Sequence, residues 1–165
     1  MAAAGALALA AAMGLVGCAS ARDRVQIANL KQGLMRASQN GVWEVYQEGS
    51  RFNVAENGQC VVDSKTTSCM WFGLAFDYTA PSARTTLKCT WTSREPIVSV
   101  TPTQVLERDI TEEQVELVLE QRRGHQATPN YVEAPWRGGE THLKYECSDR
   151  AGVVLSVTFE LVGSA

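Results

Sequence analysis

Hydrophobic and polar positions divide the chain into a uniformly apolar start and a long remainder in which they alternate. Residues 1–21 contain no charged side chain, and Ala, Leu, Met and Val dominate them. In the later part of the chain, short alternating segments are separated by turn-forming residues, which is typical of antiparallel strands. In the clearest run, Leu87, Cys89 and Trp91 are separated by polar residues. This pattern predicts a mainly β chain.

Two segments indicate how the strands are arranged. Residues Cys69–Tyr78 are apolar on both faces, so they predict a central strand that is covered on both sides. The Asn57-Gly58 pair predicts a two-residue hairpin turn, because both residues tolerate the positive φ that such turns require.

Two cross-strand registers follow from the apolar faces. In the C-terminal hairpin, a three-residue loop over 150–152, with glycine in the left-handed position of a bulge, keeps the apolar residues on one side. That loop pairs Cys147 with Leu155 and Asp149 with Val153. An earlier hairpin with its turn over 63–66 would place Cys60 opposite Cys69.

Two other segments predict helices. Within residues 23–39, Ile27, Leu30 and Leu34 fall on one helical face. Within residues 111–123, Thr111 and Gln114 have the spacing of a capping box. The buried stripe of this second helix would be Val115, Val118 and Leu119.

The expected fold class is therefore mainly β: an antiparallel β-sandwich or flattened barrel of about seven or eight strands, with one or two helices. The length of 165 residues fits one ordinary domain. Internal repeats and low-complexity tracts are absent from the sequence after the apolar start.

The apolar start ends in Leu15-Val16-Gly17-Cys18. It is short for a membrane span and is typical of a secretory signal peptide. The four residues resemble the lipobox of bacterial lipoprotein signal peptides, although the usual basic residue near the start is missing. The resemblance implies that Cys18 is lipidated and becomes the N-terminus of the mature protein. An uncleaved N-terminal anchor and ordinary secretion are the alternatives.

Lipidation would place the protein in the cell envelope. Two or three acyl chains, at about 0.8 kcal/mol per buried CH₂, hold a protein on a membrane far longer than one chain does. Because Ala19 follows the cysteine, the resemblance implies an outer-membrane lipoprotein facing the periplasm, if the source has two membranes. The expected organisation is a signal peptide over 1–17, a lipidated N-terminus, tether and probable helix over 18–40, and a disulfide-stabilised β domain over 41–165.

The five cysteines divide into one lipid carrier and four others. Among the three connectivities open to four cysteines, the hairpin geometry favours Cys60 with Cys69, which leaves Cys89 with Cys147. By lowering the entropy of the unfolded chain, the bond that closes the longer loop, of about sixty residues, would stabilise the fold by about 4 kcal/mol, against less than about 3 for the shorter loop. The alternative is a zinc site, but the sequence has no C-x₂-C spacing.

An aperiodic stretch over 126–140 contains the candidate residues for binding a partner. Aromatic and arginine side chains are enriched in contact surfaces, and this stretch holds Tyr131, Trp136 and Arg137. In the alternative interpretation, Tyr131 and Trp136 plug the open end of the sandwich.

Few residues suit catalysis or metal binding. The sequence has only two histidines, and it lacks the serine-hydrolase, zinc-protease and phosphate-loop motifs. His142 is expected on a solvated strand face, His125 at the end of the second helix, and Glu112 with Glu113 at its start. We therefore expect no enzyme activity, no cofactor and no metal. The net charge of −3 without a basic cluster also argues against a nucleic-acid partner.

A second resemblance lies at the C-terminus. Tyr145-Glu146-Cys147 followed by residues 153–159 is similar to the opening hairpin of membrane-bound C-type lysozyme inhibitors, although in that family the hairpin begins the domain. The resemblance implies an inhibitor of a periplasmic hydrolase such as lysozyme. The leading hypothesis from the sequence is a lipid-anchored envelope protein that acts as a binding or accessory module with an envelope protein partner.

Overall fold

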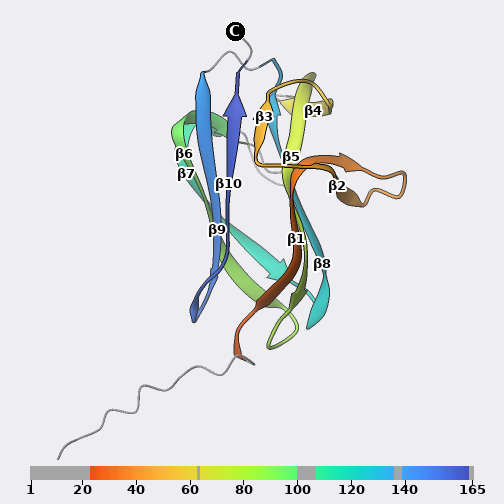
Figure 1. Cartoon of the computed structure of the whole chain (residues 1–165), viewed down its shortest axis with the longest axis vertical. Coiled ribbons are helices and arrows are strands. Elements are labelled where there is room, and N and C mark those ends of the chain that lie inside the picture. The colour runs from red at the N-terminus through yellow and green to blue at the C-terminus, as the bar shows by residue number, and fades with distance from the viewer. Residues whose placement is uncertain (1–22, 63, 100–106, 136–138, 164–165) are drawn as a thin grey trace, which may run out of the picture.

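The computed structural model describes residues 23–62, 64–99, 107–135 and 139–163, which form ten strands in two five-stranded sheets (Figure 1). Sheet A consists of β1 (Gln26–Ala37), β2 (Trp43–Glu48), β4 (Gly58–Val62), β5 (Lys65–Thr79) and β8 (Arg123–Glu133). Sheet B consists of β3 (Arg51–Asn53), β6 (Thr85–Ser99), β7 (Glu107–Leu119), β9 (Glu140–Asp149) and β10 (Gly152–Val162). The predicted fold class, a β-sandwich, is confirmed.

Strand β5 is the centre of sheet A. Its first residues pair with β4 and its later residues with β1 along the same edge, while β8 pairs with eleven residues of its other edge. The side chains from Cys69 to Phe76 are buried, apart from the half-buried Trp71. The prediction of a central strand covered on both faces is therefore confirmed.

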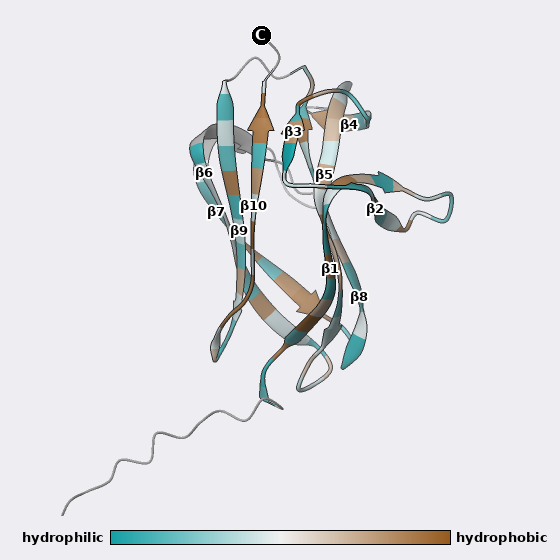
Figure 2. Ribbon diagram, in the orientation of Figure 1, coloured by the Kyte–Doolittle hydropathy of each residue, from teal (hydrophilic) through white to brown (hydrophobic). Residues whose placement is uncertain are grey.

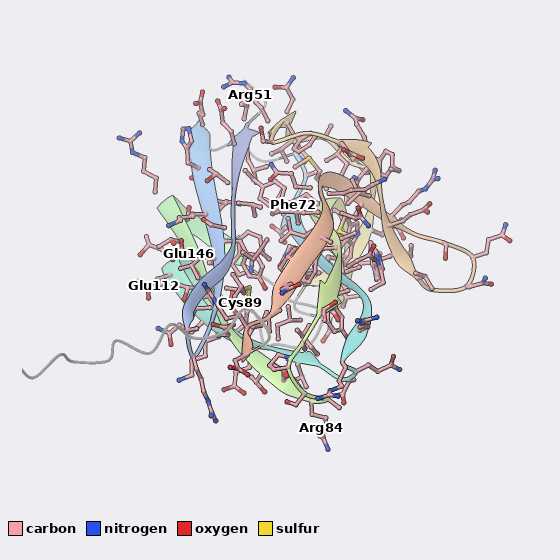
Figure 3. All side chains as sticks on the ribbon, turned by 60° about the horizontal axis from the view of Figure 1, so that its bottom comes forward. Arg51, Phe72, Arg84, Cys89, Glu112 and Glu146 are labelled. Carbon is pink, nitrogen blue, oxygen red and sulfur yellow. A yellow bond between two sulfur atoms is a disulfide. The ribbon has the colours of Figure 1, made fainter. Side chains whose placement is uncertain are left out.

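The main core lies between the two sheets. Phe72 of β5 packs edge-on against Phe159 of β10, with ring centroids 5.2 Å apart, and against Trp91 of β6 at 6.2 Å. Figure 3 shows Phe72 on sheet A between the two layers, and Figure 2 shows the alternation of hydrophobic and hydrophilic residues along β9 and β10. Burial of one such side chain contributes roughly 1.5–3 kcal/mol. The inward positions Leu87 and Tyr145 are buried as predicted.

The sandwich differs from the expectation in two general respects. None of the described residues forms an α-helix, and β3 pairs with β10 in parallel, whereas the other paired strands are antiparallel. In the part of the chain that the structure describes, no helix is long and apolar enough to cross a membrane.

The helix predicted within residues 23–39 is wrong, because this segment forms β1. Ile27 lies opposite Tyr78 and Leu34 opposite Phe72, so eight residues of β1 span seven residues of β5. The extra residue is taken up by a bulge between Ala28 and Lys31. Since a bulge shifts the two-residue period of a strand by one, the apolar spacing resembles that of a helix. The third residue of the supposed helical face, Leu30, is 41% exposed.

The helix predicted over 111–123 is also wrong, because residues up to Leu119 form β7. Val115 lies opposite Cys89 and Leu117 opposite Leu87 on β6. Inward positions therefore recur every second residue, and Val118, assigned to the helical stripe, is 38% exposed. Capping signals act only at a helix terminus, whereas pairing with β6 stabilises the whole segment as a strand.

Both hairpin registers needed correction. Val62 pairs with Lys65 and Cys60 with Thr67, so the turn has two residues and the cysteines are diagonal neighbours instead of direct partners. At the C-terminus, Cys147 does pair with Leu155, as predicted. However, Asp149 pairs with Gly152, not with Val153, because the extra residue enters as a bulge between Val153 and Leu155.

The turn predicted at Asn57-Gly58 is wrong as well. The strand before it, β3, belongs to sheet B, and the strand after it, β4, belongs to sheet A. The pair therefore lies where the chain crosses between layers, and no hairpin forms there.

Candidate binding surface

The structure places the predicted site residues in different environments. Cys60 is bonded to Cys69 and Cys89 to Cys147, with Cα atoms 5.9 and 4.0 Å apart, so both predicted disulfides are present. The predicted lipidation site Cys18 and two candidate contact residues, Trp136 and Arg137, lie outside the described residues. The third contact residue, Tyr131, is 7% exposed and lies in β8, so part of the stretch expected to be aperiodic is a strand.

A second apolar cluster covers the outer face of sheet A, away from the main core. Trp71 of β5 lies directly opposite Tyr131 of β8, and their ring centroids are 4.7 Å apart. The indole of Trp43 from β2 packs on the other side of Trp71 at 4.6 Å. We call Trp43, Trp71 and Tyr131, together with the adjacent Cys60–Cys69 disulfide, the aromatic corner.

The corner forms because the β1–β2 hairpin bends away from the sandwich. Figure 1 shows this hairpin projecting sideways from sheet A, and we call residues 34–48 the arm. Gly33 marks its base: a Cβ atom there would overlap the carbonyl oxygen of Gln47. Just beyond it, the side chain of Met35 is fully buried, with its sulfur near Gly73 of β5. The bend thus brings Trp43 against the outer face of sheet A.

Asn57 holds Trp71 in place from the edge of the sheet. Its side-chain oxygen accepts a hydrogen bond from Trp71 N at 2.6 Å, and its side-chain nitrogen donates to Trp71 O at 3.0 Å. The indole nitrogen of Trp71 donates to the carbonyl of Gln59 at 3.0 Å. Because the polar groups of Trp71 have partners, the exposed part of this residue is mainly its apolar ring.

The rim of the aromatic corner is accessible and has a composition suited to protein contacts. Trp43 and Trp71 are half-buried, whereas Tyr46 on the arm is 41% exposed and Val42 at its tip 59%. The guanidinium of Arg36 lies 5.4 Å from the centre of the Tyr46 ring. Aromatic residues and arginine are the residue types enriched where proteins bind one another.

The phenol of Tyr131 supports the corner instead of offering acid–base chemistry. Burial raises its pKa, and the charge of Glu133 raises it further, so the hydroxyl keeps its proton at neutral pH. That hydroxyl donates a hydrogen bond of 3.4 Å to the carbonyl of Val61 on β4.

Two clusters of titratable side chains elsewhere are engaged in ion pairs. Glu140, His142 and Glu160 lie close together, but Arg51 pairs with both carboxylates and so offsets part of their negative charge. His142 is exposed on β9, as expected.

The other cluster centres on Asp77 of β5. His125 faces it from β8 with Nδ1 2.9 Å from Asp77 Oδ1, and Asn29 donates to Oδ2 at 2.7 Å. The predicted place of His125 at a helix terminus is therefore wrong, because the residue lies in a strand. Through Asn29 and His125, Asp77 links three neighbouring strands of sheet A: β1, β5 and β8.

Sequence reasoning found only part of this surface. The alternation along residues 69–78 predicts apolar side chains on both faces of the strand, and the structure shows Phe72 in the main core and Trp71 against the second cluster. Nothing in the sequence indicates that Trp43 contacts it, because that contact depends on the bend at Gly33. The hairpin that resembles lysozyme inhibitors forms β9 and β10, and its Tyr145 and Cys147 face the core. The inhibitory role implied by that resemblance stays a prediction.

The sequence matches no protein-family model, and no curated protein is similar to it. Among solved structures, an immunoglobulin-like protein from Pseudomonas aeruginosa is similar, with 14% identity and a TM-score of 0.49. The match covers 86% of this chain and 98% of that one. From its own topology, this chain is a two-sheet β-sandwich with one disulfide inside each sheet.

Proposed function

We propose that this protein is a lipid-anchored module of the bacterial cell envelope, on the outer membrane and facing the periplasm, which binds a protein partner through the aromatic corner. The anchor is supported by the lipobox-like residues that end at Cys18. Two disulfides support an oxidising compartment, because such bonds persist mainly in exported proteins.

The stacking of Trp43 on Trp71 carries the binding part of the proposal. The core face of β5 is already filled by residues such as Phe72 and Leu74, so the sandwich does not need large rings on its other face. An apolar patch that is rimmed by polar residues typically marks an interaction site. Binding, with no chemistry at this surface, is the role that such a patch supports.

The anchor is tested by Cys18→Ser. We expect the native protein in the membrane fraction, with the added mass of a diacylglycerol on its mature N-terminus. The variant should lack this mass and should be released from the membrane fraction. Mass spectrometry of the purified N-terminus reads the modification directly. An unmodified thiol in the native protein would overturn the anchor.

The binding surface is tested by site-specific photocrosslinking in the native envelope. A photoreactive residue at Tyr46 should yield a defined crosslinked partner, whereas the same residue at Thr92, exposed on the outer face of sheet B, should not. Trp43→Ala should reduce the yield at position 46 by about tenfold or more, in line with the loss of an interface anchor.

Trp43→Ala is preferred to Trp71→Ala because Trp43 lies at the periphery and its loss should leave the melting temperature nearly unchanged. Equal crosslinking from positions 46 and 92, or a full yield in a folded Trp43→Ala variant, would contradict the proposal. Val153→Ala, which removes an exposed apolar side chain at the start of β10 in sheet B, serves as the matched control.

A further inference from the structure

One end of the sandwich gathers arginines that are distant in the sequence. The start of β1 and the turns β5–β6, β7–β8 and β9–β10 all lie at the lower end in Figure 1. In Figure 3, which brings this end forward, Arg84 extends outward from it. We call the following residues the arginine end: Arg24, Arg84, Arg122, Arg123 and Arg150.

Direct hydrogen bonds hold these segments in one surface. Asp149 beside the β9–β10 turn accepts from Val25 N at 3.0 Å, so the N-terminal segment is fixed to that turn. Arg122 of the β7–β8 turn donates to the carbonyl of Pro81 at 2.9 Å, which joins it to the β5–β6 turn. Gln26 at the start of β1 pairs with Thr79 at the end of β5, so the two joined pairs of segments adjoin at one end, although the sequence contains no basic cluster.

The patch is positive in a protein that is negative overall. The N-terminal segment and the turns that carry the five arginines, with the residues next to them, hold three carboxylates: Asp23, Glu120 and Asp149. Asp77, further along β5, pairs with His125. Both carboxylate oxygens of Asp149 accept backbone N–H groups, from Val25 and Ala151. Glu120 pairs with Arg84 at 3.7 Å, and both side chains are largely exposed. The whole chain has a formal net charge of −3, so the surplus of positive charge here departs from the average.

The tether brings this same end to the membrane. Val25 is the first buried residue that the structure describes, and only seven residue steps separate it from Cys18. A fully extended chain of that length reaches at most about 25 Å. A lipid on Cys18 therefore keeps the arginine end close to the headgroups, while the aromatic corner lies on the side of the sandwich and its rim projects outward on the arm.

From this placement we infer that the arginine end docks on anionic phospholipid headgroups of the membrane that holds the Cys18 lipid, and so fixes the orientation of the domain. The inference rests on the proposed lipid anchor. Arginines near an anionic membrane surface each strengthen association about fivefold. Docking holds the sandwich upright and keeps the arm turned towards the periplasm.

The test uses the lipidated protein reconstituted through its own lipid into vesicles. Phenylglyoxal labelling of arginines is read at each site by mass spectrometry, in vesicles containing phosphatidylglycerol and in vesicles of phosphatidylcholine alone. We expect Arg84, Arg123 and Arg150 to be protected only in the anionic vesicles, while Arg36 on the arm is labelled equally in both. About 1 M salt should remove the protection, because it shortens the Debye length to about 3 Å.

A triple variant, R84Q/R123Q/R150Q, keeps Arg24 and Arg122, whose guanidinium groups hold backbone carbonyls. It should lower the ratio of docked to undocked protein about 100-fold, and Arg24 and Arg122 should then be labelled equally in both vesicles. The control variant R36Q/K65Q/K144Q removes the same charge elsewhere and should protect the arginine end like the native protein.

Each outcome has a distinct meaning. Protein that does not float with either kind of vesicle refutes the lipid anchor itself. Protein that floats but shows equal labelling of the arginine end in both vesicles refutes the docking while the anchor stands. Protection by soluble polyphosphate without protection by anionic vesicles would assign the patch to another anion and would also refute the docking.

Discussion

At the scale of single residues, Asn57 shows how a side chain completes a sheet. β4 pairs with β5 as far as Cys69 and β1 pairs from Phe72 onward, which leaves Trp71 between them on that edge. The Asn57 amide bonds both backbone groups of Trp71 and so replaces a missing strand residue. A buried backbone group without a hydrogen-bond partner would cost roughly 1–3 kcal/mol of stability. Asn57 therefore prevents unsatisfied backbone groups beneath the aromatic corner.

Asp77 gives a prediction at the same scale. Its hydrogen bond from Asn29, and then its bond with His125, lower its pKa below the ordinary value of 3.8. A carboxylate with a lowered pKa stabilises the fold above its unfolded-state pKa, and that contribution is lost as pH falls through the folded-state pKa. The melting temperature of Asp77→Asn should therefore fall less than that of the native protein as the pH decreases below about 4.

Thermal melts between neutral and strongly acidic pH measure this effect. The control Glu56→Gln removes an exposed carboxylate from the chain between β3 and β4. If Asp77→Asn and the native protein lose stability in parallel over the acidic range, the Asn29–Asp77–His125 contacts have no role in acid sensitivity.

At the scale of elements, local signals and long-range pairing gave different answers. The continuous apolar pattern of β5 and the alternation of β6 predict strands correctly. A strand buried on both faces needs apolar residues at every position, and a strand buried on one face needs them at every second position. β1 and β7 carry helix-like signals: a bulge changes the apolar period of β1, and residues 111–114 of β7 have the spacing of a capping box. The aromatic corner and the arginine end join segments far apart in sequence, so no local pattern contains them.

The bend at Gly33 is the element whose loss should be most visible. Its φ of 158° and the overlap of any Cβ with Gln47 O predict that Gly33→Ala destabilises the protein by about 1–3 kcal/mol and displaces the arm. Displacement should weaken the near-UV circular dichroism that arises from Trp43 against Trp71.

Gly139→Ala is the matched control, because an added Cβ there meets no atom within 4 Å. It should leave both stability and the aromatic spectrum unchanged. A native-like spectrum and melting temperature in Gly33→Ala would show that the arm can bend without this glycine.

At the scale of the whole molecule, each disulfide stays inside its own sheet. Cys60–Cys69 joins β4 to β5 in sheet A, and Cys89–Cys147 joins β6 to β9 in sheet B. Antibody domains instead carry a disulfide between their two sheets. The two layers of this sandwich are held together by the core that surrounds Phe72, and the disulfides act by restricting the unfolded chain.

The two bonds should therefore differ in their effect on stability. Removing the bond with a sequence separation of 58, by C89A/C147A, should cost about 4 kcal/mol, against less than about 3 for C60A/C69A with a separation of 9. Denaturant unfolding of both double variants measures the difference. A larger loss from the short bond would show that native packing at the aromatic corner, and not loop closure, dominates.

Strand β7 lies at one edge of sheet B, and among the described strands it pairs only with β6. Its outward positions include Glu112 and Glu116, and Glu120 follows its end. Two copies that tried to extend their sheets edge to edge would bring these negative charges against one another. Electrostatic repulsion between copies therefore disfavours the pairing of two β7 edges into a shared sheet.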